Sequence, residues 1–120
     1  MTLSPLETLI KARELISDPE RWTQGVYARN RSGHRVIYYE SDACRFCSLG
    51  AIRRSVSETG GFDLKREMDA TSILARAIAG VSPRKQWSSE AVVFEFNDTH
   101  THAEVLAAFD RAIERARADQ

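Results

Sequence analysis

The amino-acid sequence predicts an α+β fold that is predominantly helical, with about four helices packed against a short β-hairpin or small antiparallel sheet. Apolar residues recur at helical spacing in residues 6–16 and again in residues 105–116, which is typical of amphipathic helices. Residues 24–40 are rich in β-branched and aromatic side chains, which favour strands. A chain of 120 residues with 42% hydrophobic residues has the size of one globular unit, so we expect a single domain over residues 1–120.

The first helix is expected to begin at Ser4. The Ser4 hydroxyl can accept a hydrogen bond from a free backbone N–H, Pro5 suits the first turn, and Glu7 completes a capping box. The helix is expected to end at residues 17–19, Ser-Asp-Pro, because proline cannot continue it. The same Asp-Pro pair can begin a short turn that carries Trp22 inward.

The predicted hairpin consists of residues 25–28 and residues 36–39, which flank the polar turn 30–34. Both flanks contain β-branched and aromatic residues, as strands do. An isolated hairpin is only marginally stable in water, so one of its faces is expected to pack on the helices.

The second helix is predicted over residues 43–58, with Ser41 or Asp42 as its N-cap. The Gly50-Ala51 pair lies in the middle of this helix, where glycine lowers helix propensity. We therefore expect another element to approach the helix backbone closely at that point.

The third and last helices carry clear end signals. Asp63 is expected to cap the third helix, and Gly80 and Pro83 are expected to close it. Thr101 and Glu104 form a second capping box at the start of the last helix. The side chains of the third helix expected to face inward are Leu64, Met68, Thr71, Leu74, Ala75, Ile78 and Ala79.

Residues 91–96 are apolar but short, and periodicity alone does not separate a strand from a buried helical turn there. Their β-branched and aromatic content slightly favours a strand. The preceding residues 84–90 are expected to form a polar loop that is interrupted by Trp87.

Residues 44–47 form a C-x-x-C motif at a predicted helix start, a position that lowers the pKa of a thiol. Such a motif indicates a redox pair or half of a zinc site, and the nearest further metal ligands are His100 and His102. However, this spacing matches no standard zinc site. The favoured interpretation makes Cys47 a small core residue and Cys44 incidental, so neither a metal nor another cofactor is expected.

Residues 97–102, Asn-Asp-Thr-His-Thr-His, are the most polar cluster and directly precede a helix, whose free N–H groups can hold an anion. Asp98 and His100 could orient one another and, with Cys47, would form a thiol-hydrolase constellation. The favoured interpretation is a capping segment in which Asn97 and Asp98 bond backbone groups.

Arginines strongly outnumber acidic residues between positions 21 and 57, although the whole chain carries 17 basic and 17 acidic residues. Tyrosines alternate with these arginines, as on nucleic-acid-binding surfaces. A solvated hairpin face explains the same pattern and is slightly favoured. The candidate binding residues are Arg29, Arg31, Arg35, Asn97 and Asp98.

Three motifs run in order through most of the chain: Trp22-x-x-Gly25, Phe46-Cys47-x-x-Gly50-Ala51, and Phe96-Asn97-Asp98 followed by Thr101-x-x-Glu104-Val105. This order resembles a family of small uncharacterised proteins of bacteria and their phages, described only as a domain of unknown function. The positions of Phe46 and Phe96 are usually tryptophan in that family, and Cys44, His100 and His102 fall outside its motifs. The resemblance therefore supports the fold and supplies no mechanism.

The resemblance also implies a packing arrangement. Trp22, Phe46 and Phe96 would form one aromatic cluster. Gly50-Ala51 would let the Asn97-Asp98 turn approach the second helix. Asn97 and Asp98 would then bond backbone groups of a neighbouring element.

These observations favour a small non-enzymatic binding or regulatory protein, related to phages or mobile elements, that acts through the hairpin and the 97–102 turn. The alternatives are a thiol-dependent enzyme that uses Cys47 with His100 and Asp98, or a zinc-stabilised nucleic-acid-binding module. The expected partner is another protein or a small ligand. Nucleic acid is the alternative partner through the arginine-rich region 21–57, and a homodimer is compatible with the sequence.

The sequence shows neither a secretory signal nor a run of about twenty apolar residues of the kind that spans a bilayer. We therefore expect a cytoplasmic protein with no membrane partner. Two cysteines in a chain of this length do not indicate a disulfide framework, which agrees with that expectation.

Overall fold

The computed structural model describes residues 3–79 and 88–119. Its helices are α1 (Pro5–Leu15), α2 (Ser48–Glu58), α3 (Leu64–Ala79), α4 (Ser89–Thr99) and α5 (His102–Ala118). A 3-10 helix, η1 (Pro19–Arg21), follows α1, and an antiparallel sheet joins β1 (Ala28–Arg29) to β2 (Arg45–Phe46). The predicted class, a predominantly helical α+β fold, is confirmed, with five α-helices among the described residues in place of about four.

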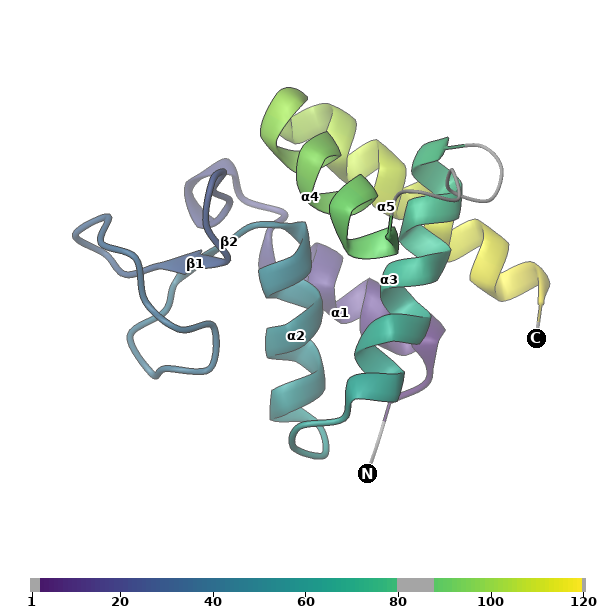
Figure 1. Ribbon diagram of the computed structural model, residues 1–120, viewed down its shortest axis with the longest axis horizontal. Helices are drawn as coiled ribbons and strands as arrows, with labels where there is room; N and C mark the ends of the chain where they lie inside the picture. The colour runs from purple at the N-terminus through teal and green to yellow at the C-terminus, as the bar shows by residue number, and fades with distance from the viewer. Residues whose placement is uncertain (1–2, 80–87, 120) are drawn as a thin grey trace.

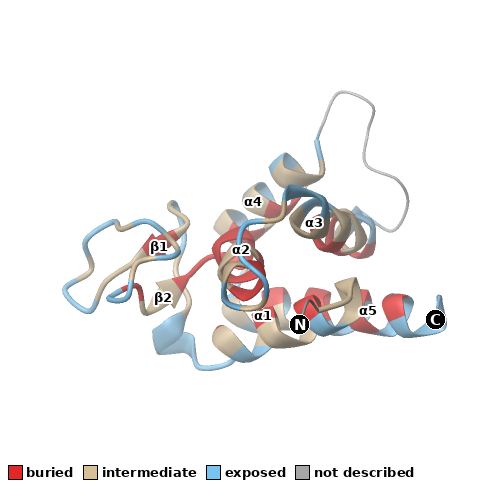
Figure 2. Ribbon diagram, turned by 90° about the horizontal axis from the view of Figure 1, so that it is seen from below, coloured by how far each residue is buried: buried red, intermediate tan, exposed pale blue. Residues whose placement is uncertain are grey.

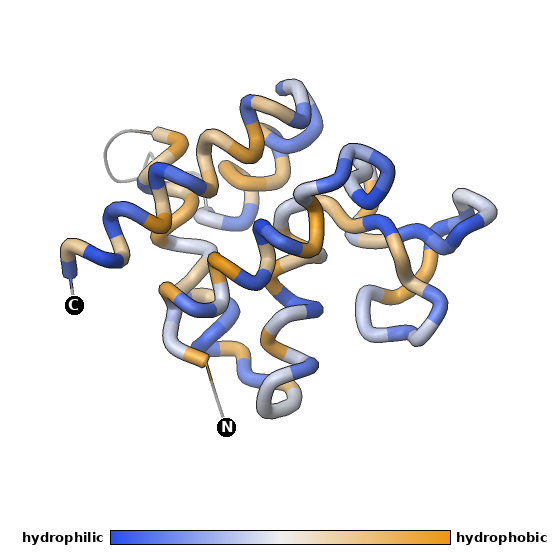
Figure 3. Tube along the Cα trace, turned by 180° about the vertical axis from the view of Figure 1, so that it is seen from behind, coloured by the Kyte–Doolittle hydropathy of each residue, from blue (hydrophilic) through white to orange (hydrophobic). Residues whose placement is uncertain are grey.

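The helices form one body, and residues 22–47, here called the projecting segment, extend from it (Figure 1). Helix α3 packs against α4 and α5, and α1 packs against α2 and α5. Hydrophobic and hydrophilic residues alternate along the helices (Figure 3), and the buried positions lie where the helices meet (Figure 2). The largest fully buried side chains are Phe46, Phe109, Leu9, Ile16, Leu49, Ile52 and Leu74. Within the described residues, no helix is long and apolar enough to cross a membrane.

The helix ends follow the capping signals closely. Ser4 and Glu7 form the expected capping box of α1, and Thr101 and Glu104 form that of α5. Asp18 caps η1 by accepting a hydrogen bond from the Glu20 N–H. These local bonds satisfy N–H groups that the first helical turn leaves free, which explains why short motifs locate the ends.

The predicted hairpin is correct at its turn and wrong in its second strand. Asn30 N–H donates to the His34 carbonyl at 2.9 Å, which closes the turn. Residues 36–39 do not form a strand, however: the Val36 N–H donates to the Ala28 carbonyl and Arg35 bridges to Arg29, but the strand that pairs with β1 is β2. Pairing with β2 brings Phe46 into the core at 2% exposure, whereas Ile37 stays 47% exposed. Burial of the Phe46 side chain stabilises the pairing of β1 with β2.

Helix α2 begins at Ser48, not at residue 43, because Arg45 and Phe46 belong to β2. Its N-cap is therefore Cys47 in place of Ser41 or Asp42. The expected close approach at Gly50 is present: a Cβ at this position would lie 2.0 Å from the Tyr27 carbonyl oxygen. The approaching element is thus the projecting segment, not the Asn97-Asp98 turn.

Residues 91–96 lie in α4, so the slight preference for a strand is wrong. Ser88 starts the helix by accepting from the Ala91 N–H at 3.1 Å. Val93 and Asn97 are its buried positions, and their separation of four residues places both on one helical face. Trp87, like Gly80 and Pro83, lies outside the described residues.

The N-terminal end of α3 is more exposed than expected. Asp63 accepts from the Arg66 N–H, but Leu64 and Met68 are 67% and 44% exposed, so their predicted inward orientation is wrong. The inward position is taken by Arg66, which donates to the carbonyls of Val56 and Thr59 and thereby satisfies the end of α2. Ala79, at the other end, is exposed as well, whereas Thr71, Leu74 and Ala75 are buried as expected.

Candidate ligand-binding site

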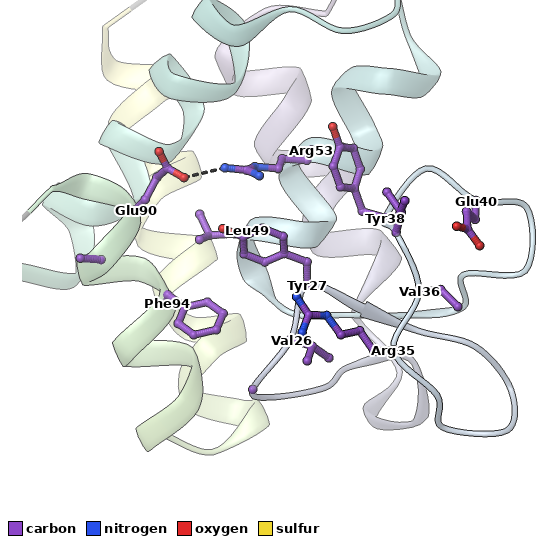
Figure 4. A pocket seen from close by; sticks show the side chains of 13 residues that line it. Val26, Tyr27, Arg35, Val36, Tyr38, Glu40, Leu49, Arg53, Glu90 and Phe94 are labelled. Atoms are coloured by element: carbon purple, nitrogen blue, oxygen red, sulfur yellow. Dashed lines mark hydrogen bonds and ion pairs between the residues drawn. The ribbon is translucent and has the colours of Figure 1, made fainter.

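A cleft of about 860 Å³ lies between the projecting segment and helices α2 and α4 (Figure 4). Its lining combines apolar, aromatic and charged side chains. The lining residues are Gly25, Val26, Tyr27, Arg35, Val36, Ile37, Tyr38, Glu40, Leu49, Arg53, Glu90, Ala91 and Phe94.

The apolar wall of the cleft is built around Tyr27. Its ring meets the Phe94 ring edge to face, with the ring centres 5.9 Å apart, and Leu49 lies beside both (Figure 4). The Tyr27 backbone is held against α2, because its carbonyl accepts from the Cys47 N–H at 3.2 Å and packs on Gly50. The close approach at Gly50 therefore sets the position of this wall.

Arg53 carries a positive charge into one end of the cleft, where two carboxylates compensate it. Its guanidinium lies 2.6 Å from Glu90 and 3.3 Å from Glu67, and it also stacks over the Tyr27 ring. Burial raises the pKa of Glu67, and Arg53 opposes that rise. Burial likewise raises the pKa of Tyr38, so its hydroxyl stays protonated at neutral pH and can donate a hydrogen bond.

Arg35 lies at the other end of the cleft, with Tyr27 between it and Arg53 in Figure 4. Its side chain is exposed, and within the described residues it has neither a hydrogen bond nor an ion pair. The predicted binding residue Arg29 differs, since its guanidinium donates to the Thr23 hydroxyl and the Gly33 carbonyl. Arg31 is exposed and lines a separate, smaller cleft of about 410 Å³.

Asn97 organises the contact between the projecting segment and the helices. This side chain is fully buried, and its Oδ1 accepts from Trp22 Nε1 at 2.8 Å and from the Ser48 N–H at 3.0 Å. Its Nδ2 donates to the Thr23 carbonyl at 3.0 Å. Asp98 accepts from the Gly25 N–H at 2.9 Å, so the expected backbone bonds of both residues are confirmed.

The three motif aromatics do not form one cluster. The Trp22 ring contacts His102, with the ring centres 5.4 Å apart, whereas Phe96 stacks on His100 at 3.8 Å. Trp22 and Phe46 are linked through a backbone bridge. In the described part of the chain, no ring contact joins two of the three, although all three border the same hydrophobic core.

Both histidines of the polar cluster bond backbone carbonyls. His102 Nε2 lies 2.6 Å from the Ile16 carbonyl and His100 Nδ1 lies 3.0 Å from that of Phe96, so each of these ring nitrogens acts as the donor. Residues 97–99 end α4 and His102 begins α5, so only His100 and Thr101 lie between the helices. Together with the bonds of Asn97 and Asp98, these contacts tie residues 97–102 to their surroundings.

Cys47 is buried, and its Sγ accepts a hydrogen bond from the Gly50 N–H. Burial raises the pKa of this thiol to about 11, which corrects the expectation that the helix start lowers it. No hydrogen bond joins Cys47 to His100 or Asp98 in the described residues. Nor do three or more His, Cys, Asp or Glu side chains of those residues gather as a metal site, so Cys44, Cys47, His100 and His102 form none.

Several cleft residues were missed by the sequence reasoning. The cleft is lined by Arg53 from α2 and by Glu90 and Phe94 from α4. Because a strand was favoured for residues 91–96, the wall that α4 provides was not predicted. The sequence signal that could have revealed helix α4 was Ser88, a suitable N-cap three residues before Ala91.

The fold and site define a small helical α+β protein with a cleft beside a projecting segment. The chain belongs to a family of unknown function, DUF6197, whose family model matches residues 1–115. The resemblance to a family of unknown function is thereby confirmed. Comparisons with curated proteins and with solved structures give no significant match.

Proposed function

We propose that the protein is a binding protein that takes a small ligand into the cleft between the projecting segment and helices α2 and α4. The observation that carries this proposal is the cleft itself, which combines an aromatic wall with charged groups at both ends. Its volume of about 860 Å³ lies within the range typical of small-molecule sites.

The lining side chains are of kinds that recognise a ligand. Tyr27, Leu49 and Phe94 offer apolar contact, and the Tyr38 hydroxyl offers a hydrogen bond. Arg35 stays among the binding residues under this proposal, whereas Arg29, Asn97 and Asp98 act by holding the projecting segment in place.

A small ligand is favoured over nucleic acid because the chain carries as many acidic as basic residues, and three of the seven arginines in region 21–57 are engaged internally. Arg54 donates to the Tyr38 and Glu40 carbonyls and pairs with Glu58. The guanidinium of Arg29 bonds the projecting segment, and Arg53 is paired with carboxylates. A surface that binds the phosphate backbone needs several free cations. A relationship to phages or mobile elements stays a prediction.

The proposal is tested by isothermal titration calorimetry with 2-naphthalenemethanol, a neutral aromatic probe, on the native protein and on Ala91→Trp. Ala91 is exposed and lines the cleft, so the indole should fill the cleft without disturbing the core. We expect binding to the native protein and a loss of at least tenfold in affinity for Ala91→Trp.

The matched control is Ala103→Trp, which places the same side chain on an exposed position in the first turn of α5, outside the cleft. It should bind the probe as the native protein does. Absence of binding to the native protein, or equal affinity for all three proteins, would contradict the proposal.

A further inference from the structure

We infer that the cleft is selective for an aromatic monocarboxylate, whose carboxylate pairs with Arg35 while its ring packs against Tyr27 and Phe94. This inference rests on the proposed binding function and names the chemical class of the ligand.

The charge balance of the cleft points to an anion at one end. Arg53 is compensated by Glu67 and Glu90, which leaves little free positive charge beside it. Arg35 has no compensating partner within the described residues and lies on the opposite side of Tyr27 in Figure 4. A guanidinium presents two parallel N–H donors, which match the two oxygens of a carboxylate.

The same balance disfavours an anion of higher charge. Glu40 and Glu90 both line the cleft, so a second negative charge on the ligand would face like charges. One unpaired guanidinium therefore suits a single negative charge better than a phosphate monoester, which carries close to two at neutral pH.

The aromatic character expected of the ligand follows from the side chains of the apolar wall around Tyr27. Arg53 stacks on Tyr27, and the edge of one ring meets the face of the other in the Tyr27–Phe94 pair. A planar ring placed beside Phe94 and Leu49 extends this arrangement with offset or edge-to-face contacts, which aromatic pairs prefer. Arg35 and the rings lie on the same cleft, so one molecule can contact both (Figure 4).

The test compares three naphthalene probes by titration calorimetry at low ionic strength: 2-naphthoate, the neutral 2-naphthalenemethanol and the phosphate monoester 2-naphthyl phosphate. We expect native protein to bind 2-naphthoate about tenfold more tightly than either other probe, since charge-assisted hydrogen bonds to an exposed guanidinium are of this order. In Arg35→Gln this preference for the carboxylate should disappear, while affinity for 2-naphthalenemethanol should stay within about twofold.

The matched control is Arg31→Gln, which removes another exposed arginine of the same turn but lies outside the cleft. It should leave the carboxylate preference unchanged. Equal affinity of the native protein for 2-naphthoate and 2-naphthalenemethanol would overturn the inference but keep the proposed cleft. Tighter binding of 2-naphthyl phosphate would overturn the single-charge assignment, and no binding of any probe would overturn the proposed function as well.

Discussion

At the scale of single residues, Asn97 joins the projecting segment to two helices, α2 and α4. It bonds the Trp22 indole, the Thr23 carbonyl and the start of α2 at Ser48, and it is fully buried. A buried amide with all these partners satisfied is stabilising, because the loss of one partner leaves the others unpaired away from water.

Asn97→Ala is therefore expected to lower the free energy of unfolding by about 3 kcal/mol, since it removes the partner of three donors, the Trp22 indole and the Ser48 N–H and hydroxyl, and of one acceptor, the Thr23 carbonyl. Urea denaturation followed by circular dichroism measures the change. Glu114→Ala, an exposed change that removes the ion pair with Arg117, should cost less than about 0.5 kcal/mol. Equal stability of the two variants would contradict the assigned role of Asn97.

Cys47 gives the fold a dependence on alkaline pH. The pKa of its thiol is raised to about 11 in the folded protein by burial, from an ordinary value of 9.0. Because the unfolded thiol ionises first, this contribution to stability is complete below about pH 9 and declines as the pH rises toward 11.

We expect the free energy of unfolding of the native protein to fall more steeply between pH 9 and pH 11 than that of Cys47→Ala. Urea denaturation over this pH range gives both slopes. Parallel pH profiles would show that the Cys47 thiol ionises alike in the folded and unfolded chains, contrary to its burial.

At the scale of elements, local signals predicted the helix ends better than the pairing of strands. Both capping boxes involve side chains three residues apart, so their sequence is sufficient to recognise them. The pairing of β1 with β2 joins residues far apart in the sequence and is stabilised by burial of Phe46, which only the assembled core provides. The helical state of residues 91–96 was equally hard to predict from local sequence, because the hydrogen bonds of Asn97 to residues distant in the sequence favour the helix.

The contact between α2 and the projecting segment depends on Gly50. An alanine there raises helix propensity by about 1 kcal/mol, but its Cβ would lie 2.0 Å from the Tyr27 carbonyl oxygen, so the backbone must shift. We expect the clash to dominate and Gly50→Ala to destabilise the fold by about 2 kcal/mol. Thermal unfolding monitored by circular dichroism measures this.

Ser57→Ala in the same helix serves as the control, because its hydroxyl donates to a carbonyl of its own helix, that of Arg54. It should change the stability by less than about 0.5 kcal/mol. A Gly50→Ala variant as stable as this control would mean that Tyr27 is not held against α2.

At the scale of the whole molecule, the cleft arises because the projecting segment is anchored at its base. Asn97, Asp98 and Gly50 fix that base, while Arg35, which follows the 30–34 turn, lines the cleft. The radius of gyration is 13.1 Å, close to the roughly 13.6 Å expected for a compact chain of this length, so the segment stays near the helices. Arg35 could be recognised from the sequence as a candidate binding residue. The opposite wall of the cleft could not, because it depends on residues 91–96 being part of helix α4.

The most direct test of the cleft is the set of intermolecular nuclear Overhauser effects between 2-naphthoate and the protein. The account predicts contacts from the naphthalene protons to Tyr27, Leu49 and Phe94, all of which line the cleft. Contacts confined to Phe62 and Leu64, the most exposed large apolar side chains among the described residues, would contradict it.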